Sequence, residues 1–201
     1  MASDFHSHRR KSAARTLVSG TAPDGLASFQ AHPWDAAEPL TTVDLAAFAA
    51  IGETGLDKVK GPASDIQIRR FEEMLELARR ENKSVVIHCV RAWAELLEIR
   101  KRFPTQNWLI HGFRGSPELA EQLRKQGFFL SLGMAGIEKL LKKGFSLERI
   151  GFETDEEDRH IEEILQTAAA KLGLHVSEVE YITDRNFEEF LCLNVSREPF
   201  C

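Results

Sequence analysis

The feature that most constrains the fold of this chain is the alternation of short β-rich runs with helical stretches. Eight such runs occur along the sequence. The candidate strands are Ser3–Ser7, Arg15–Ser19, Leu26–Ala31, Ala47–Gly52, Ser84–Cys89, Trp108–His111, Phe128–Leu132 and Ile150–Glu153. Eight strands with helices between them predict an α/β fold of the TIM-type (β/α) barrel class.

Capping patterns indicate where helices begin between the later strands. Ser64 and Gln67 form a capping-box pattern, and apolar residues follow them at helical spacing. Ser116–Pro117 supplies an N-cap and a proline at the first helical position. Ser177 and Glu180 form a second capping-box pattern. The expected later helices cover residues 118–126, 159–172 and 178–193.

The first part of the chain is too short for regular β/α units. Barrels of this class typically need about 250 residues, and this chain has 201. Few residues separate the first two candidate strands, and the next connection, Gly20–Gly25, is a Pro/Gly turn. Because a parallel crossover needs a dozen or more residues, we predict a shortened, irregular N-terminal part in which the second strand runs antiparallel.

Length and composition predict one globular domain over residues 1–201. Hydrophobic residues make up 43% of the chain, which is enough for a sizeable core. The 26 basic and 31 acidic residues give a formal net charge of −5. This balance argues against binding nucleic acid by bulk charge, which needs a basic excess. An enzyme that holds nucleic acid at a local site stays possible.

The sequence also indicates in which cellular compartment the protein is expected. The first 20 residues contain no continuous apolar stretch of the kind found in signal peptides, and no apolar run approaches the ~18 residues of a membrane span. The three cysteines, Cys89, Cys192 and Cys201, have no close spacing and are interpreted as reduced thiols. We therefore expect a cytoplasmic protein with no membrane partner. Its oligomeric state stays open, and a monomer is compatible with these features.

Ionisable side chains gather at the predicted carboxyl ends of several strands, which in a β/α barrel open onto the face where active sites form. His6 and His8 lie two residues apart and project to the same side of a strand. The others are Glu53, His88, His111 and the segment Glu153–Asp155. A mixed nitrogen and oxygen set suits Zn²⁺, Mn²⁺, Co²⁺ or Fe²⁺, and suits Mg²⁺ or Ca²⁺ less well.

Six ligands are too many for one tetrahedral ion with an open position. They fit two ions that lie about 3.5–4 Å apart and share a carboxylate bridge. His32 precedes Pro33 at the end of the third strand and faces the same rim. It either lines the site or caps the strand.

The ordered motifs of the chain resemble those of the TatD family, and the resemblance extends from residue 4 to about residue 191. The motifs are Asp4–His8, Ala31–Pro33, Ile51–Asp57, Val86–Cys89, His111–Ser116 and Glu153–Asp155. The resemblance implies a metal-dependent hydrolase with an amidohydrolase-like barrel, commonly described as a deoxyribonuclease. The chain is similar to a short branch of the family, trimmed between the first strand and the His-Pro motif.

Carried over by position, the resemblance implies a metal-binding site for two divalent cations, with Zn, Mn, Co and Mg as candidates. His6, His8 and Asp155 would hold one ion, and His88 and His111 the second. Glu53 would bridge the two ions. Asp155 and Glu53 are also the candidate catalytic residues. Asp155 would orient the attacking water and accept its proton, with a role as ligand alone as the alternative.

Three basic residues follow ligand motifs on the predicted rim, namely Lys58, Arg91 and Arg114. They are candidate phosphate contacts, and salt bridges to surface carboxylates are the alternative. Trp34 either packs at the rim or stacks a base. Cys89 alternates away from His88 and is interpreted as packing, not as a nucleophile.

The leading hypothesis is a nuclease, that is, a phosphodiesterase that acts on DNA or another phosphodiester. On DNA we expect it to cleave at strand ends. The same ions would also polarise a carbonyl, so hydrolysis of a carboxylic ester, amide or lactone is the alternative enzyme function. A third hypothesis is a catalytically degenerate barrel that only binds a ligand. A basic rim favours the phosphodiester, and an apolar rim favours the carbonyl substrate.

Overall fold

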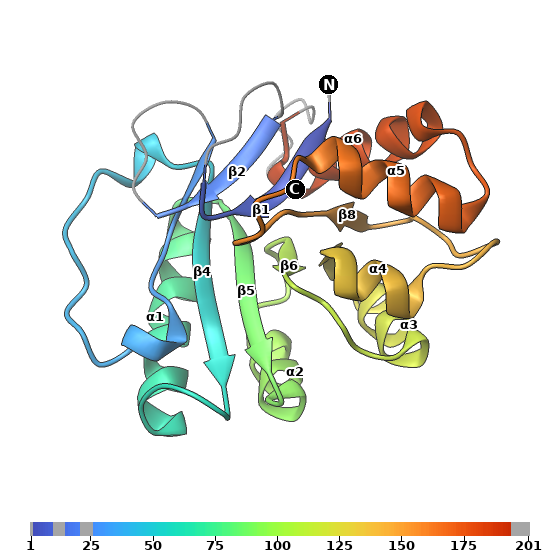
Figure 1. The fold of residues 1–201 in the computed structure, drawn as a ribbon. Helices are drawn as coiled ribbons and strands as arrows, with labels where there is room; N and C mark the ends of the chain where they lie inside the picture. Colours follow the sequence, from blue (N-terminus) through green and yellow to red (C-terminus); the bar gives the residue numbers. More distant parts are fainter. Residues whose placement is uncertain (1, 10–14, 21–25, 194–201) are drawn as a thin grey trace.

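Eight parallel strands form the centre of the protein in a computed structural model that describes residues 2–9, 15–20 and 26–193 (Figure 1). Each strand pairs with the next one along the chain. The strands are β1 (Ser3–Ser7), β2 (Arg15–Ser19), β3 (Ala27–Phe29), β4 (Ala50–Asp57), β5 (Ser84–Val90), β6 (Trp108–Ile110), β7 (Phe129–Leu132) and β8 (Ile150–Phe152). This arrangement confirms the predicted TIM-type (β/α) barrel.

The sheet is brought to near closure by contacts between the end of β1 and the segment after β8. The backbone nitrogen of Asp155 donates to the oxygen of His6 at 3.0 Å, and His8 donates to the oxygen of Asp155 at 3.2 Å. Below them, the buried Asp4 carboxylate accepts from the Thr154 hydroxyl at 2.7 Å and from the Thr154 backbone nitrogen at 3.1 Å. These bonds hold the two ends of the sheet together.

The predicted antiparallel direction of the second strand is wrong, because β2 pairs in parallel with both β1 and β3. The prediction assumed that a parallel crossover needs a dozen or more residues, a length that accommodates a helix. Among the described residues no helix lies between β1 and β3. Seven residues separate Ser7 from Arg15. Extended chain of that length can reach about 23 Å, whereas a five-residue strand rises only about 17 Å. A short connection can therefore return to start a parallel strand without a helix.

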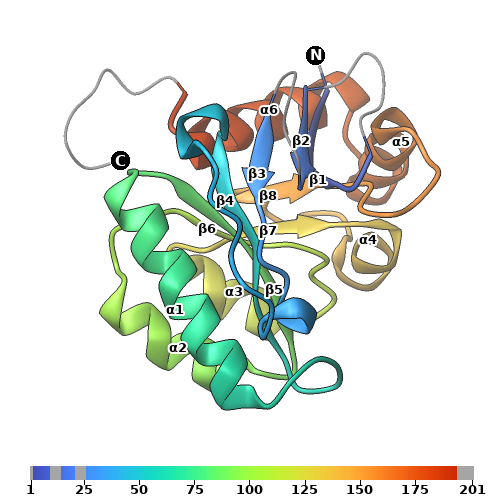
Figure 2. The same cartoon turned by 90° about the vertical axis from the view of Figure 1, so that its left-hand side faces the viewer.

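Six α-helices and two single 3₁₀ turns account for the other regular elements of the described residues. They are η1 (Pro33–Asp35), η2 (Leu45–Ala47), α1 (Ser64–Arg80), α2 (Trp93–Arg102), α3 (Pro117–Lys125), α4 (Met134–Leu140), α5 (Ile161–Leu172) and α6 (Val176–Leu191). Figure 2 shows α1 and α2 side by side on the outside of the barrel. Helices α2 and α4 were not predicted from the sequence. No helix in the described part of the chain combines the length and the apolar character that crossing a membrane requires.

The predicted helix caps agree with the structure in one case of three. Ser116 caps α3 as predicted, accepting from the Leu119 backbone nitrogen at 3.3 Å. Ser64 is already the first residue of α1, so it cannot cap that helix, and α1 has no side-chain cap. The N-cap of α6 is His175, because the helix begins at Val176 and already contains Ser177.

The cysteine interpretation holds for one of the two described cysteines. Cys89 is a free thiol, and burial raises its pKa to about 12, which keeps it protonated near neutral pH. Cys192 is disulfide-bonded, so the expectation of reduced thiols is wrong for this residue. An odd number of cysteines still leaves room for one pair. Cys201 lies outside the described residues.

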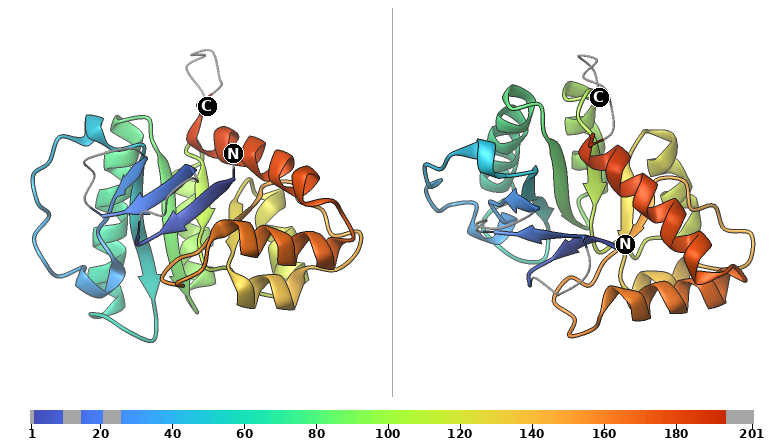
Figure 3. Two further views of the ribbon diagram at one scale, coloured as in Figure 1. Left: turned by 45° about the horizontal axis from the view of Figure 1, so that its top comes forward. Right: turned by 90° about the horizontal axis from the view of Figure 1, so that it is seen from above.

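Helix α6 closes the end of the barrel at which the strands begin. Figure 3 shows it beside the start of β1. The helix contacts a cluster of buried side chains from six strands, to which it adds three of its own. The cluster comprises Phe5, Leu17, Ala50, Val86, Leu109, Phe129, Phe187, Phe190 and Leu191. Ser84, the first residue of β5, donates its hydroxyl to the Phe190 carbonyl. The site described below lies at the opposite end.

Replacement of Phe187 by alanine is expected to lower the free energy of unfolding by about 3–5 kcal/mol. The Phe187 ring is fully buried and packs edge-on against Phe5, with ring centroids 5.0 Å apart. Urea denaturation measures the change. Tyr181→Ala on the same helix is the control, because this side chain is 63% exposed and its removal should alter stability by less than about 0.5 kcal/mol. If both substitutions changed the free energy of unfolding equally, the assignment of α6 as the helix that closes this end of the barrel would be wrong.

Candidate metal centre

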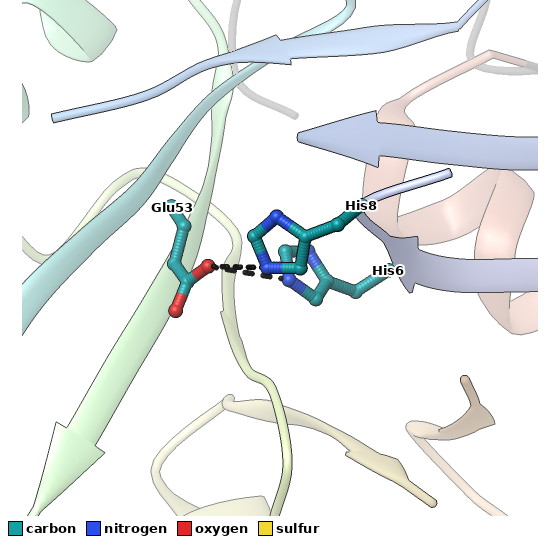
Figure 4. Close-up of side chains that lie close together, drawn as sticks. All are labelled: His6, His8 and Glu53. Atoms are coloured by element: carbon teal, nitrogen blue, oxygen red, sulfur yellow. Dashed lines mark ion pairs between the residues drawn. The ribbon is translucent and has the colours of Figure 1, made fainter. Parts of the chain in front are cut away.

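The carboxylate of Glu53, on β4, lies at the centre of the candidate site. The residue is buried, with 2% of its surface exposed. Its Oε2 lies 3.3 Å from Nε2 of His6 and 3.3 Å from Nε2 of His8. Figure 4 shows these two rings converging on the same oxygen from β1 and the segment after it. One oxygen of Glu53 therefore faces the first pair of predicted ligands.

The other oxygen of Glu53 faces a second group of histidines. Oε1 lies 2.7 Å from Nε2 of His111, 2.9 Å from Nδ1 of His88 and 3.1 Å from Nε2 of His32. His88 and His111 are themselves neighbours, with 3.3 Å between Nδ1 and Nε2. The two oxygens of a single carboxylate thus divide five imidazoles into two groups.

His32 differs from the other histidines in the bond at its second ring nitrogen. Its Nδ1 accepts a hydrogen bond from the backbone nitrogen of Trp34 at 3.2 Å. In a neutral imidazole the proton then resides on Nε2, which donates to Glu53. His32 therefore lines the site, and its Nδ1 caps η1 and not the preceding strand.

Asp155 follows β8 and completes the first group. Its Oδ1 lies 3.5 Å from Nε2 of His8 and 3.9 Å from Nε2 of His6. Its backbone φ is 49°, a left-handed conformation that aspartate tolerates better than most residues. The side chain is 38% exposed, so it faces the open end of the site while Glu53 lies beneath it.

Two glycines in β4 allow Glu53 to approach β5 closely. Gly52 has a φ of 114° and Gly55 a φ of 142°, both in the region that favours glycine. A Cβ atom on Gly52 would overlap the carbonyl oxygen of Val86, and one on Gly55 would overlap that of His88. The Gly-Glu-Thr-Gly sequence therefore permits the close contact between Glu53 and His88.

A second carboxylate holds His88 from the other side. Asp57, the last residue of β4, lies with Oδ2 3.2 Å from Nε2 of His88. Although burial acts to raise the pKa of Asp57, hydrogen bonds from the Trp34 indole and from two backbone nitrogens lower it. The carboxylate therefore stays ionised and can fix the tautomer of His88 with Nε2 protonated and Nδ1 toward Glu53. Metal-binding histidines commonly have such an outer carboxylate partner.

Glu153 occupies the corresponding position behind His111. It is buried, and its Oε1 lies 3.8 Å from Nδ1 of His111 and accepts from the Gly112 backbone nitrogen at 2.6 Å. The Ser131 hydroxyl donates to its other oxygen. Burial acts to raise the pKa of Glu153, but the contact with His111 and the other hydrogen bonds lower it.

The electrostatics of the site follow from these contacts. Burial acts to raise the pKa of Glu53, but His111 and the other facing histidines lower it far below its usual range. A hydrogen bond to Glu53 raises the pKa of His8. Burial opposes protonation of His111, yet the two nearby glutamates raise its pKa well above the usual value. The carboxylates therefore create a buried negative potential that favours positive charge on or between the facing imidazoles.

Buried atoms without a hydrogen-bond partner indicate that the cluster fits a metal ion. Among the described residues, both ring nitrogens of His6, Oε2 of Glu53 and Nδ1 of His111 are of this kind. Such atoms are costly unless something binds them. Three groups have ligand atoms within 4.8 Å of one another, namely His6–His8–Glu53, His6–His111–Asp155 and His32–Glu53–His88. Their nitrogen and oxygen donors suit a divalent transition metal.

The cluster lies at the bottom of an open cavity of about 610 Å³. The structure brings the six predicted ligands and His32 together there. Of the predicted phosphate contacts, Arg91 and Arg114 line the cavity. Lys58 is not among the lining residues and instead forms an ion pair with Glu95, with 2.6 Å between Nζ and Oε1. Lys60 lines the cavity in its place.

Three residues of the site, Asp57, Glu153 and Lys60, were not predicted from the sequence. A signal was present for the two acids, since each belongs to a motif that also contains a predicted ligand. The rule that a metal-binding histidine has a carboxylate behind it would have pointed to both. Lys60 has no such signal, because which lysine of the loop turns inward depends on the fold of the loop.

Fold and site together define a (β/α) barrel with a candidate metal centre at the carboxyl ends of its strands. The sequence profile of the family described as "TatD related DNase" matches residues 6–192. The chain belongs to the TatD family, as its motifs indicated.

Similar curated proteins include human and bacterial members. The human protein named deoxyribonuclease TATDN3 is 26% identical over 189 residues, which cover 84% of this chain and 69% of that protein. The uncharacterized metal-dependent hydrolase YabD of Bacillus subtilis is 35% identical over 115 residues, or 51% of this chain and 44% of YabD. The human 3'-5' RNA nuclease TATDN2 is 36% identical over 119 residues, or 53% of this chain and 16% of TATDN2. The chain thus spans less than half the length of the last two.

Solved structures share the fold. The TatD homologue YJJV from Escherichia coli superposes with a TM-score of 0.68 at 19% identity, covering 88% of this chain and 85% of that one. An uncharacterized amidohydrolase from Saccharomyces cerevisiae gives 0.67 at 13% identity, covering 88% of each chain. At these identities the likeness concerns the fold alone.

Glu53→Ala is expected to reduce the content of bound divalent metal from about two ions per chain to below one. The substitution removes the carboxylate that faces both histidine groups, and protein loaded with Mn²⁺ or Zn²⁺ and then gel-filtered can be analysed by mass spectrometry of the metal. Glu98→Ala is the control, because the Glu98 side chain is 71% exposed on α2. A Glu53→Ala protein that keeps both ions would contradict the central position of this carboxylate in metal binding.

Proposed function

We propose that the protein is a phosphodiesterase that hydrolyses DNA or another phosphodiester with a water activated between two divalent ions. The observation that supports this most directly is the division of the Glu53 carboxylate. One oxygen lies 3.3 Å from the His6 and His8 nitrogens, and the other lies 2.7–2.9 Å from His111 and His88. A carboxylate with a ligand group at each oxygen is suited to bridge two ions.

In this proposal His6, His8 and Asp155 would hold one ion and His88 and His111 the other, with Glu53 available to both. Divalent ions so held would supply Lewis acidity and lower the pKa of water enough to give hydroxide near neutral pH. Asp57 is a positioning residue, because it can fix the orientation of His88 through Nε2, the ring nitrogen that faces away from Glu53. Glu153 lies behind His111, with Oε1 3.8 Å from Nδ1, and places a negative charge there.

Asp155 is the proposed general base. Its partly exposed carboxylate belongs both to the group with His6 and His8 and to a cluster with His111, so it lies within reach of both halves of the site. It can accept the proton that water loses as oxygen bonds to phosphorus and the bond to the leaving oxygen breaks. Glu53 is less suited to this step, because its oxygens face histidines and it is buried.

The composition of the rim favours a phosphodiester over a carboxylic ester, amide or lactone. Arg91, Arg114 and Lys60 line the cavity together with the acidic Asp35 and Glu156. Guanidinium groups can hold phosphate by paired hydrogen bonds. The names of two relatives, a deoxyribonuclease and an RNA nuclease, also support a nucleic-acid substrate.

The net charge of −5 restricts how such a substrate is held. Without a basic excess the protein gains little from long contacts along a duplex, so binding would depend on the ions and a few rim residues. This local mode of binding suits cleavage at strand ends. A degenerate barrel that only binds is less favoured, since the six predicted ligands are all present.

Asp155→Asn is expected to lower kcat for a DNA substrate by about 10²–10⁴-fold while the bound metal is retained. Asparagine keeps an oxygen ligand but cannot accept the proton. Metal content and steady-state rates on the same preparation test both parts. Asp158→Asn is the matched control, because that side chain is 97% exposed. Unchanged activity of Asp155→Asn would leave Asp155 as a ligand only.

His111→Ala is expected to remove one of two ions and to abolish phosphodiesterase activity, because His111 lies in the second histidine group. Wild type and variant should be assayed on single- and double-stranded DNA, a generic phosphodiester and a carboxylic ester. Activity that survives with unchanged metal content would overturn the two-ion proposal. Hydrolysis of the carboxylic ester alone would favour the carbonyl substrate.

A further inference from the structure

Trp34 is an exposed aromatic residue at the wall of the metal-site cavity. It lies in η1, just after His32, and 43% of its surface is exposed. Its ring centroid is 4.5 Å from that of His32 and 6.0 Å from that of His88. The indole is therefore beside the histidine group on the Oε1 side of Glu53.

The indole is held in one orientation. Its Nε1 donates to Oδ2 of Asp57 at 2.7 Å, and the same carboxylate accepts from the backbone nitrogens of Val59 at 2.7 Å and Lys60 at 3.0 Å. Because the ring is fixed before any ligand arrives, binding to its face sacrifices little side-chain entropy.

The surroundings of the ring combine apolar surface with a positive charge. Val59 is 58% exposed and also lines the cavity. The Lys60 ammonium lies 4.1 Å from the centroid of the Trp34 ring, and it forms no ion pair with any residue in the described part of the chain. An ammonium so placed can leave the ring face and meet a phosphate without breaking a salt bridge.

The other two tryptophans have different surroundings. Trp108 is fully buried, and Trp93 packs edge-on against Phe113 with ring centroids 5.9 Å apart. Both have packing roles. The exposure of Trp34 does not fit a packing role. Its hydrogen bond to Asp57 does not explain the exposure either, because that bond requires only the indole nitrogen.

We propose that Trp34 is a specificity-determining residue that stacks on the base of the nucleotide next to the cleaved bond, while Lys60 contacts a phosphate of the same strand. Stacking on an indole accepts any base, because every base has a π face. The base must be unpaired to reach the ring. This inference rests on the proposed phosphodiesterase function and adds the feature of the substrate that the cavity wall recognises.

The test combines a change in the protein with a change in the substrate. Two oligonucleotides are compared, one normal and one with a tetrahydrofuran abasic unit on each side of the cleaved bond. Wild type should show a kcat/KM for the normal strand that is higher by roughly 5- to 100-fold, the range expected of one stacked base. In Trp34→Ala this ratio should fall toward one.

Trp34→Phe separates stacking from the hydrogen bond to Asp57. Both variants lose the indole N–H, but only phenylalanine keeps an aromatic face. We therefore expect Trp34→Phe to keep most of the ratio. A loss of the ratio in Trp34→Phe as complete as in Trp34→Ala would show that Trp34 acts by positioning Asp57, and it would overturn the proposal. Metal content and thermal unfolding verify that both variants are folded and loaded.

The outcomes also distinguish this inference from the function on which it rests. If wild type cleaves neither strand, the phosphodiesterase proposal fails. If wild type cleaves both strands equally well, that proposal holds and the stacking inference fails. A ratio that persists unchanged in Trp34→Ala assigns base recognition to another part of the cavity and likewise overturns the inference.

Discussion

The buried carboxylate of Glu53 is the interaction on which the rest of the site depends. An ionised group with 2% of its surface exposed needs compensation, and the chain provides five imidazoles around it. Those imidazoles come from β1, β5 and segments that follow β1, β3 and β6, so no single element can form the site. The carboxylate in turn keeps histidines together that would otherwise repel one another when protonated. Divalent cations are the natural partners of such an arrangement, since they replace those protons.

The barrel positions these groups through contacts outside the site. The bonds between β1 and the segment after β8 set Asp155 beside His6 and His8, and the buried Asp4–Thr154 pair supports them from below. Asp57 holds His88 from the side that faces away from Glu53, and Glu153 lies behind His111. Arg91 and Arg114 contribute charge at the rim. The geometry around Glu53 is therefore determined by the nearly closed sheet and by the outer carboxylates together.

The sequence predicted the barrel and the convergence of the ligands because both follow from local patterns. The strands, and the polar residues at their ends, can be recognised from the sequence alone, without knowing which strands pair with each other. The direction of β2 could not be predicted in this way, because it depends on how short a connection suffices when no helix covers it. The caps of α1 and α6 were missed because α1 begins one residue, and α6 two residues, before the position that its capping pattern suggests. Lys60 lines the cavity and Lys58 does not, because Lys58 forms an ion pair with Glu95 on α2. This contact between distant parts of the chain could likewise not be predicted.

The last of the described helices is also the one that closes the floor of the barrel. Residues of β1, at the start of the chain, pack against α6 across more than 180 positions of sequence, from Phe5 to Phe187. Contacts so distant along the chain form late and slow the search for the native state. During synthesis the strands that carry the ligands would leave the ribosome well before the helix that covers their base. The newly made polypeptide would therefore gain its cation-binding pocket only when translation of this region is nearly complete.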